Sequence, residues 1–273
     1  MEEKKYELTE ETKIYKGRIL HRILALKDFR DVKKGNLGGW IEREENLSHD
    51  DACWIYDDAM VYDNAKILGN AEVSGYAKVY HDAKVYDGAR VYYYAQIFNN
   101  AEIFGCANVH GDANIYGSAY IYGHADVYDN ADVHDNAKVH GRVTVHDKSC
   151  VYGNAEIYGH ADVHGNTKIY DNAKVYDDVH TYGNAEIYGH AEACGHAILF
   201  GKAHAYGNSV VMHYAIIRDH AEVYGNARIF DRAKIYCNAK VYGNAMVYGN
   251  TKVHGSAKVH DDNKIYGITD IVK

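Results

Sequence analysis

The sequence predicts an all-β solenoid of short stacked strands, and three features of one six-residue repeat carry that prediction. Every sixth residue from Ile55 to Ile271 is valine or isoleucine at 33 of 37 positions, without insertion or deletion. The residue two before each of these is alanine at 28 of 37 positions, and 20 of the 25 glycines share a third position of the repeat. A fixed short period of this kind indicates a repeat architecture.

Each hexad has the pattern of a short strand followed by a corner. The alanine and the aliphatic residue lie two apart with a polar residue between them, which is the alternation of a strand with one buried face. Glycine or aspartate follows the outward residue, and the next position is most often asparagine, with aspartate and histidine, residue types that tolerate a left-handed backbone. We therefore expect about four residues of strand and two of corner per hexad. Because every corner repeats the same turn, the strands should coil and stack.

This order of aliphatic, loose, two turn, small and polar positions resembles the hexapeptide-repeat proteins, a superfamily that includes trimeric acyltransferases. The resemblance covers about four-fifths of the chain. It implies a left-handed parallel β-helix with the form of a triangular prism, in which three hexads close one coil of 18 residues, about 12 coils in all. The tyrosine-rich hexads and the stretch Asn36-Leu37-Gly38-Gly39-Trp40-Ile41 are also similar to uncharacterised bacterial and bacteriophage proteins of this kind. Some of those carry an acetyltransferase label from their fold alone.

The chain divides into an N-terminal β cap, residues 1–48, and a hexapeptide-repeat β-helix, residues 49–273. Residues 12–15 and 18–26 alternate in polarity around Lys16 and Gly17, which predicts a hairpin. The open end of a solenoid exposes both its core and an unpaired strand edge. A terminal cap is therefore required.

Charge and cysteine content limit the partners and the compartment. The net charge of −8 is concentrated in residues 50–165, which carry 17 acidic and 7 basic residues. Solubility and corner chemistry explain this acidity, and the alternative is a surface that mimics nucleic acid or binds a basic partner. The five cysteines form no CxxC pair, which indicates reduced thiols and a cytoplasmic protein. No signal peptide or membrane span is recognisable, and neither a membrane nor a nucleic-acid partner is expected.

The position after each aliphatic residue should point outward, and it is aromatic or histidine in 31 of 36 hexads. Residues 18 apart should stack on one face. The tyrosines of one such aromatic face are Tyr62, Tyr80, Tyr116, Tyr152, Tyr170, Tyr188, Tyr206, Tyr224 and Tyr242. We favour a structural role, stacking between coils, over a platform that binds a glycan or bases.

The repeat weakens between Val179 and Ile217. Thr181, Ala193 and Ala205 take core positions that elsewhere hold valine or isoleucine. In the same coils six outward positions become apolar, namely Cys194, Ile198, Phe200, Val210, Met212 and Ile216. Placed on the prism, the six lie on two faces that meet at one edge. Contiguous apolar surface usually marks an interface, so we expect a homo-oligomer, a dimer or trimer, or a protein partner bound here.

The sequence predicts neither a metal site nor an enzyme active site. His146, His164, Asp162 and His180 should be neighbours that could bind zinc, but histidine is frequent at several positions and adjacent pairs are expected without a metal. We predict no metal, no cofactor and no catalytic residue. Acyltransferases of this fold usually interrupt the coil with a loop and place a catalytic histidine at a subunit interface, whereas these hexads are uninterrupted.

The first hypothesis is therefore a non-enzymatic, rigid interaction scaffold that associates with itself. An acyltransferase-like enzyme is the second. The third is a bacteriophage-encoded protein that binds and blocks a host defence target, through the acidic half of the solenoid.

Overall fold

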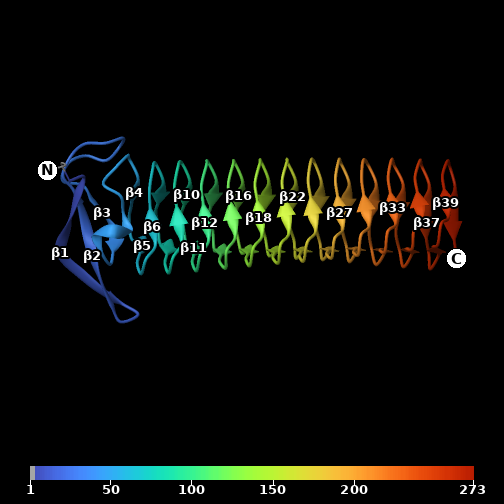
Figure 1. Cartoon of the computed structure of the whole chain (residues 1–273), viewed down its shortest axis with the longest axis horizontal. Coiled ribbons are helices and arrows are strands. Elements are labelled where there is room, and N and C mark those ends of the chain that lie inside the picture. Colours follow the sequence, from blue (N-terminus) through green and yellow to red (C-terminus); the bar gives the residue numbers. More distant parts are fainter. Residues whose placement is uncertain (1–3) are drawn as a thin grey trace. The chain divides into compact units, whose positions relative to one another are not determined.

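The computed structural model describes residues 4–273 and divides the chain into two compact units, Met1–Asp135 and Asn136–Lys273. Together the units carry about 13 turns of parallel β-solenoid, with almost no helix and an antiparallel hairpin at the N-terminus. The predicted fold class is confirmed. In each unit the strands of successive coils lie side by side (Figure 1).

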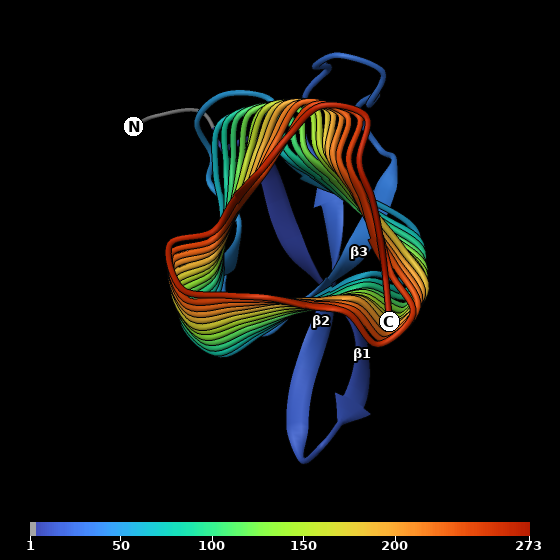
Figure 2. The same cartoon turned by 90° about the vertical axis from the view of Figure 1, so that its right-hand side faces the viewer.

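The first unit begins with the predicted hairpin. Strands β1 (Tyr6–Tyr15) and β2 (Arg18–Ala25) pair antiparallel around Lys16 and Gly17, whose φ angles of 48° and 80° fit the two-residue turn that matches strand twist. Strand β2 pairs antiparallel with β3 (Leu37–Ile41), and β3 pairs parallel with β5 (Met60–Val61). The hairpin is thus joined through β3 to the ladder of coils in its own unit, and it extends beyond their outline (Figure 2). The short 3-10 helix η1 (Glu44–Asn46) follows β3.

The coils of the first unit form three parallel ladders. The first contains β3, β5, β8 (Lys78–Val79), β11 (Gln96–Ile97), β14 (Asn114–Ile115) and β17 (Asp132–Val133). The second contains β4 (Trp54–Ile55), β7 (Glu72–Val73), β10 (Arg90–Val91), β13 (Asn108–Val109) and β16 (Asp126–Val127). The third contains β6 (Lys66–Ile67), β9 (Lys84–Val85), β12 (Glu102–Ile103) and β15 (Tyr120–Ile121).

The second unit repeats this arrangement, and its coils have a three-sided outline in Figure 2. One ladder contains β20 (Cys150–Val151), β23 (Lys168–Ile169), β26 (Glu186–Ile187), β29 (His204–Ala205), β32 (Glu222–Val223), β35 (Lys240–Val241) and β38 (Lys258–Val259). The next contains β19 (Thr144–Val145), β22 (Asp162–Val163), β25 (His180–Thr181), β28 (Ile198–Leu199), β31 (Ile216–Ile217), β34 (Lys234–Ile235), β37 (Lys252–His254) and β40 (Asp270–Val272). The third contains β18 (Lys138–Val139), β21 (Glu156–Ile157), β24 (Lys174–Val175), β27 (Glu192–Ala193), β30 (Val210–Val211), β33 (Arg228–Ile229), β36 (Met246–Val247) and β39 (Lys264–Ile265).

The register confirms a coil of 18 residues, since Lys168 pairs with Glu186 and Ile169 with Ile187. The strands are shorter than expected, with two residues in most hexads instead of four. Hydrogen bonding nevertheless continues past the strand. The Tyr152 N–H, for example, donates to the carbonyl of Ile169 at 3.0 Å.

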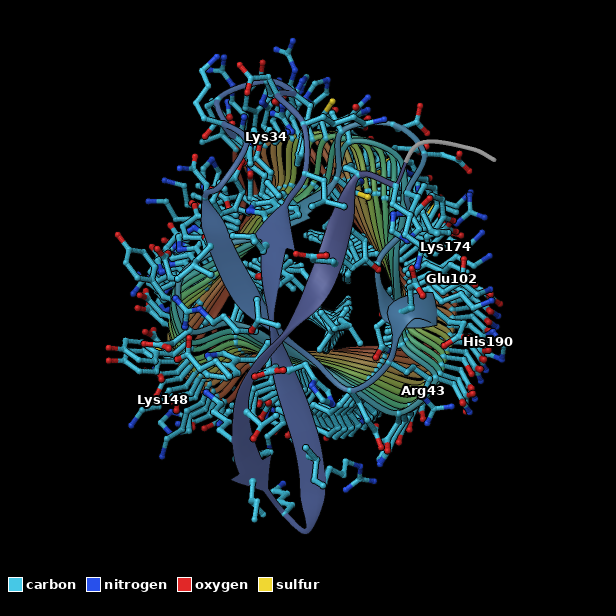
Figure 3. The ribbon with its side chains drawn as sticks, turned by 90° about the vertical axis from the view of Figure 1, so that its left-hand side faces the viewer. Lys34, Arg43, Glu102, Lys148, Lys174 and His190 are labelled. Atoms are coloured by element: carbon cyan, nitrogen blue, oxygen red, sulfur yellow. The ribbon has the colours of Figure 1, made fainter. Side chains whose placement is uncertain are left out.

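The core of each unit is the repeat's aliphatic and small residues. Those from Ile55 to Val253 are buried, and burial decreases only at the last coil, where Ile265 is half-buried. Outward polar side chains such as Glu102, Lys174 and His190 point away from the coil interior (Figure 3).

The corner residue with a left-handed backbone is the glycine or aspartate, and not the asparagine after it as the sequence suggested. Gly189 has a φ of 73° and Asp171 one of 59°. The Asp171 carboxylate accepts a hydrogen bond from the Gly189 N–H one coil on, at 3.1 Å. Asparagines at the next position form a side-chain ladder instead, in which Asn226 Nδ2 donates to Asn244 Oδ1 at 2.9 Å. Aspartate is favoured at the corner because it tolerates this backbone and links two coils.

Across residues 4–273 the structure contains no helix of the length and apolar character needed to cross a membrane.

Candidate functional site

The candidate site is the corner between β30 and β31 in the second unit, together with the two faces that meet there and carry the six residues predicted as an interface. We call the six the apolar edge: Cys194, Ile198, Phe200, Val210, Met212 and Ile216. All six are half-buried. Cys194 lies one coil before Met212 on one side of the corner, and its N–H donates to the carbonyl of Val211 at 2.9 Å.

On the other side of the corner Ile198 and Ile216 are Cα partners in the pairing of β28 with β31. Phe200 lies at the far end of this second face, where its ring stacks on Tyr182 with centroids 4.8 Å apart. The structure therefore brings five of the six residues to the corner and places Phe200 at the far end of the second face.

A hollow of about 450 Å³ lies at this corner, between the two sides of the apolar edge. It is lined by Gly195, His196, His213, Tyr214, Asp231, Arg232, Gly249 and Asn250. Gly195 has a φ of 70°, and a Cβ there would lie 2.9 Å from the backbone nitrogen of His213. Glycine at this position therefore permits both the left-handed turn and the close approach of the next coil.

The wall of the hollow is a ladder of three side chains from successive coils. The rings of His196 and Tyr214 stack with centroids 4.8 Å apart, and the Arg232 guanidinium lies 6.0 Å from the Tyr214 ring centroid. Tyr214 is 55% exposed, so one edge of this ladder projects into solvent. A planar cation beside an aromatic ring is a favourable contact that also fixes the position of the arginine.

Two histidines at the site are paired with carboxylates. His213 Nδ1 lies 3.4 Å from Asp231 Oδ1, and His196 Nδ1 lies 3.6 Å from Asp178 Oδ2. Burial raises the pKa of the Cys194 thiol above its ordinary value. A thiol with a raised pKa is largely protonated at neutral pH, so Cys194 is poorly suited to act as a nucleophile.

The coils beneath the apolar edge have a weaker core. Ala193 and Ala205 fill positions that elsewhere hold valine or isoleucine, and both are buried. The hydroxyls of Thr181 and Ser209 are buried, and neither has a hydrogen-bond partner within the described residues. An unpaired buried hydroxyl costs on the order of 1–3 kcal/mol, so these coils are less stable than coils with a fully aliphatic core.

The predicted aromatic face forms one stacked column within each unit. In the second unit the run from Tyr152 to His260 stacks at 4.8 to 5.2 Å between centroids, with interplanar angles of 2° to 20°. In the first unit Tyr62, Tyr80, Phe98 and Tyr116 stack in the same way.

Tyr62 departs from the prediction, because only 1% of it is exposed. The ring faces outward from its coil, but the hairpin covers it through Tyr15 and Leu20. It therefore belongs to the packing between the hairpin and the coils.

The histidine group considered for zinc is brought together as neighbours. His146 Nε2 lies 3.2 Å from Asp162 Oδ1, and His180 Nδ1 lies 3.5 Å from Asp162 Oδ2. The rings of His146 and His164 stack at 5.1 Å with an interplanar angle of 7°. Stacked rings direct their nitrogens side by side, whereas a tetrahedral zinc site needs them to converge on one point. The geometry supports carboxylate–histidine pairs that join neighbouring coils.

Two comparisons with known proteins match parts of this repeat. A family model described as the YdcK β-solenoid repeat matches residues 239–255, which include β35 and β36. A stretch of 62 residues is 42% identical to a protein of Escherichia coli (strain K12) named "Uncharacterized acetyltransferase YdcK". The resemblance to hexapeptide-repeat proteins is therefore confirmed. The matched stretch covers 20% of this chain and about a fifth of the relative's length, 19%.

The apolar edge of this solenoid could be predicted from the sequence, but the corner residues between its two sides were missed. His196, His213, Tyr214 and Arg232 occupy the two corner positions, which were treated as turn residues only. The available signal was their departure from the usual glycine or aspartate followed by asparagine. His213 has a φ of 59°, a backbone conformation that costs a histidine more than a glycine.

Proposed function

We propose that this protein is a rigid interaction scaffold that associates with a second copy of itself through the apolar edge. The observation that carries the proposal is the joint position of five apolar outward side chains, a hollow of about 450 Å³ and a weakened core. Each feature alone has an ordinary explanation. Their coincidence in the same coils favours a surface that is completed by a partner.

Charge and shape favour a second copy as that partner. Residues 166–273 carry 12 basic and 11 acidic residues, so two copies meeting there would experience little net repulsion. The corner also carries both a projecting ring, Tyr214, and a hollow between Gly195 and Gly249. In a two-fold interface the projecting ring of each copy faces the hollow of the other copy. Two-fold symmetry is the commonest symmetry of soluble oligomers.

The half-burial of the apolar edge limits the affinity of such a contact. Full burial of an aliphatic or aromatic side chain contributes about 1.5–3 kcal/mol, so half-buried residues have about half of that left to gain. Five such residues would contribute about 4–8 kcal/mol in total, against a cost of association of about 4–15 kcal/mol. The net free energy of association from these residues alone is close to zero. We therefore expect a concentration-dependent assembly in which Tyr214 and the hollow supply part of the affinity.

Light scattering across a dilution series tests this function. The wild type should change from oligomer to monomer on dilution, and the double variant Phe200→Glu with Met212→Glu should be monomeric throughout. Phe104→Glu, at the same repeat position in the first unit, is the matched control and should keep the wild-type mass. Equal masses for the wild type and the double variant at every concentration would exclude self-association through this edge.

Acyl transfer is the second candidate, because the hollow contains the His213–Asp231 pair beside Arg232. A histidine oriented by a carboxylate can accept the proton of an acceptor hydroxyl or amine as that group attacks an acyl thioester, and the thiol then leaves. The name of the Escherichia coli relative supports a test with acetyl-CoA. Calorimetric titration should show binding that Arg232→Ala weakens if this candidate is correct, and no heat of binding at millimolar acetyl-CoA would exclude it.

A further inference from the structure

The first unit carries a second unusual corner, formed by Tyr76, Tyr93 and Tyr94, which we call the tyrosine corner. These three side chains are 52%, 58% and 56% exposed, and they are among the few large hydrophobic residues of the coils that are exposed to this degree. They occupy the corner positions between β7 and β8 and between β10 and β11. Elsewhere the first of these positions mostly holds glycine or aspartate, and asparagine is the commonest residue at the second.

The rings of the tyrosine corner present open aromatic surface. Tyr76 and Tyr94 stack with centroids 5.2 Å apart and an interplanar angle of 6°. The Tyr93 ring has a different orientation. Its plane is tilted by 53° to that of the Tyr92 ring, and the two ring centroids are 5.2 Å apart. The corner positions one coil before and one coil after Tyr93 are Gly75 and Gly111, so no side chain at that position lies against either side of its ring.

The charge of the coils that follow this corner is one-sided. Residues 91–135 hold six acidic residues and no lysine or arginine. Asp112 is exposed and follows Tyr94 in the same column one coil on. The basic side chains of the flanking strands are engaged elsewhere, since Arg90 pairs with Glu72 at 3.5 Å and Lys78 lies over the Tyr15 ring at 5.5 Å.

We infer that the tyrosine corner binds an arginine-rich segment of a partner protein. A guanidinium can lie flat on an exposed tyrosine ring while its charge faces a carboxylate one coil on. The acidic coils attract such a segment over a longer range and orient its approach. A neutral sugar would use the rings but gain nothing from the carboxylates, and a nucleic acid would be repelled by them. The apolar edge plays no part in this binding.

Fluorescence anisotropy with a labelled hexa-arginine peptide tests the inference. The decisive variant is Tyr93→Gly with Tyr94→Asn, which installs the residues that the repeat uses most often at these two positions. It should weaken peptide binding about tenfold, the loss expected for two exposed cation–aromatic contacts. Tyr93 has a φ of 59°, so the glycine relieves strain and the variant should melt at or above the wild-type temperature.

Two further variants separate the contribution of the carboxylate from that of the aromatic rings. Asp112→Asn should weaken binding and reduce its dependence on salt. Cys106→Asn, which changes an exposed corner of the same unit without removing a ring, should bind as the wild type does. The inference is wrong if hexa-arginine does not bind, or if it binds equally to the wild type and the tyrosine double variant. It is also wrong if neutral maltohexaose binds more tightly than hexa-arginine and Asp112→Asn leaves that affinity unchanged.

Discussion

The aromatic columns should stabilise the solenoid by stacking between coils, and Tyr170 offers the clearest test. Its ring lies 4.8 Å from those of both Tyr152 and Tyr188, with interplanar angles of 2° and 3°. Its hydroxyl donates to Glu186 Oε2 at 3.4 Å. Each aromatic pair contributes about 0.5–1.5 kcal/mol beyond area burial. Tyr170→Ala should therefore cost about 1–3 kcal/mol from the two lost pairs alone.

A double-mutant cycle between Tyr170→Ala and Tyr188→Ala isolates one of these pairs. Urea unfolding followed by circular dichroism should give a coupling free energy of about 0.5–1.5 kcal/mol. The matched control pairs Tyr170→Ala with Tyr182→Ala, whose ring stacks in another column, and should be additive within about 0.5 kcal/mol. A coupling for Tyr170 and Tyr188 no larger than that control would refute the structural role of the column and favour a ligand platform.

Three further changes test the core, the corners and the pH dependence. Ile157→Asp should prevent folding of the second unit, measured by circular dichroism, because it buries an unpaired charge; a native spectrum would contradict the assigned core. Gly159→Ala should lower the melting temperature, because a Cβ there would lie 2.6 Å from the Asp177 nitrogen in a left-handed backbone; no change would contradict the corner geometry. Burial raises the pKa of Tyr170 and Tyr206 above the ordinary value of about 10. Above about pH 10 these tyrosines therefore keep protons in the folded chain that they lose in the unfolded chain. The free energy of unfolding should fall as pH rises above about 10. A free energy of unfolding that stays constant up to about pH 12 would contradict this expectation.

The repeating part of the fold could be predicted because its period is visible in the residues themselves. The alternation of alanine with valine or isoleucine determines which side chains are buried, and the 18-residue register follows once three hexads close a coil, as the pairing of Lys168 with Glu186 shows. The coil length came from the resemblance and not from the spacing. The left-handed sense of the coil has the same origin and stays a prediction.

Features that depend on several coils at once could not be predicted from one repeat position. Tyr62 follows the outward pattern, but the hairpin that covers it lies outside the repeat. The apolar edge was found because its residues break the pattern of outward polar side chains. The hollow beside it could not be predicted, because its shape depends on how the side chains of neighbouring coils lie.

The most direct test of the central claim, self-association through the apolar edge, is hydroxyl-radical footprinting of the wild type at low and high protein concentration. Met212, Phe200 and Tyr214 lie at or beside the edge and have side chains that radicals oxidise readily. Their oxidation should slow as the concentration rises, while that of Tyr76 and Tyr93 in the first unit should not change. Oxidation of Met212 and Tyr214 at the same rate across concentrations that light scattering shows to span assembly would contradict the claim.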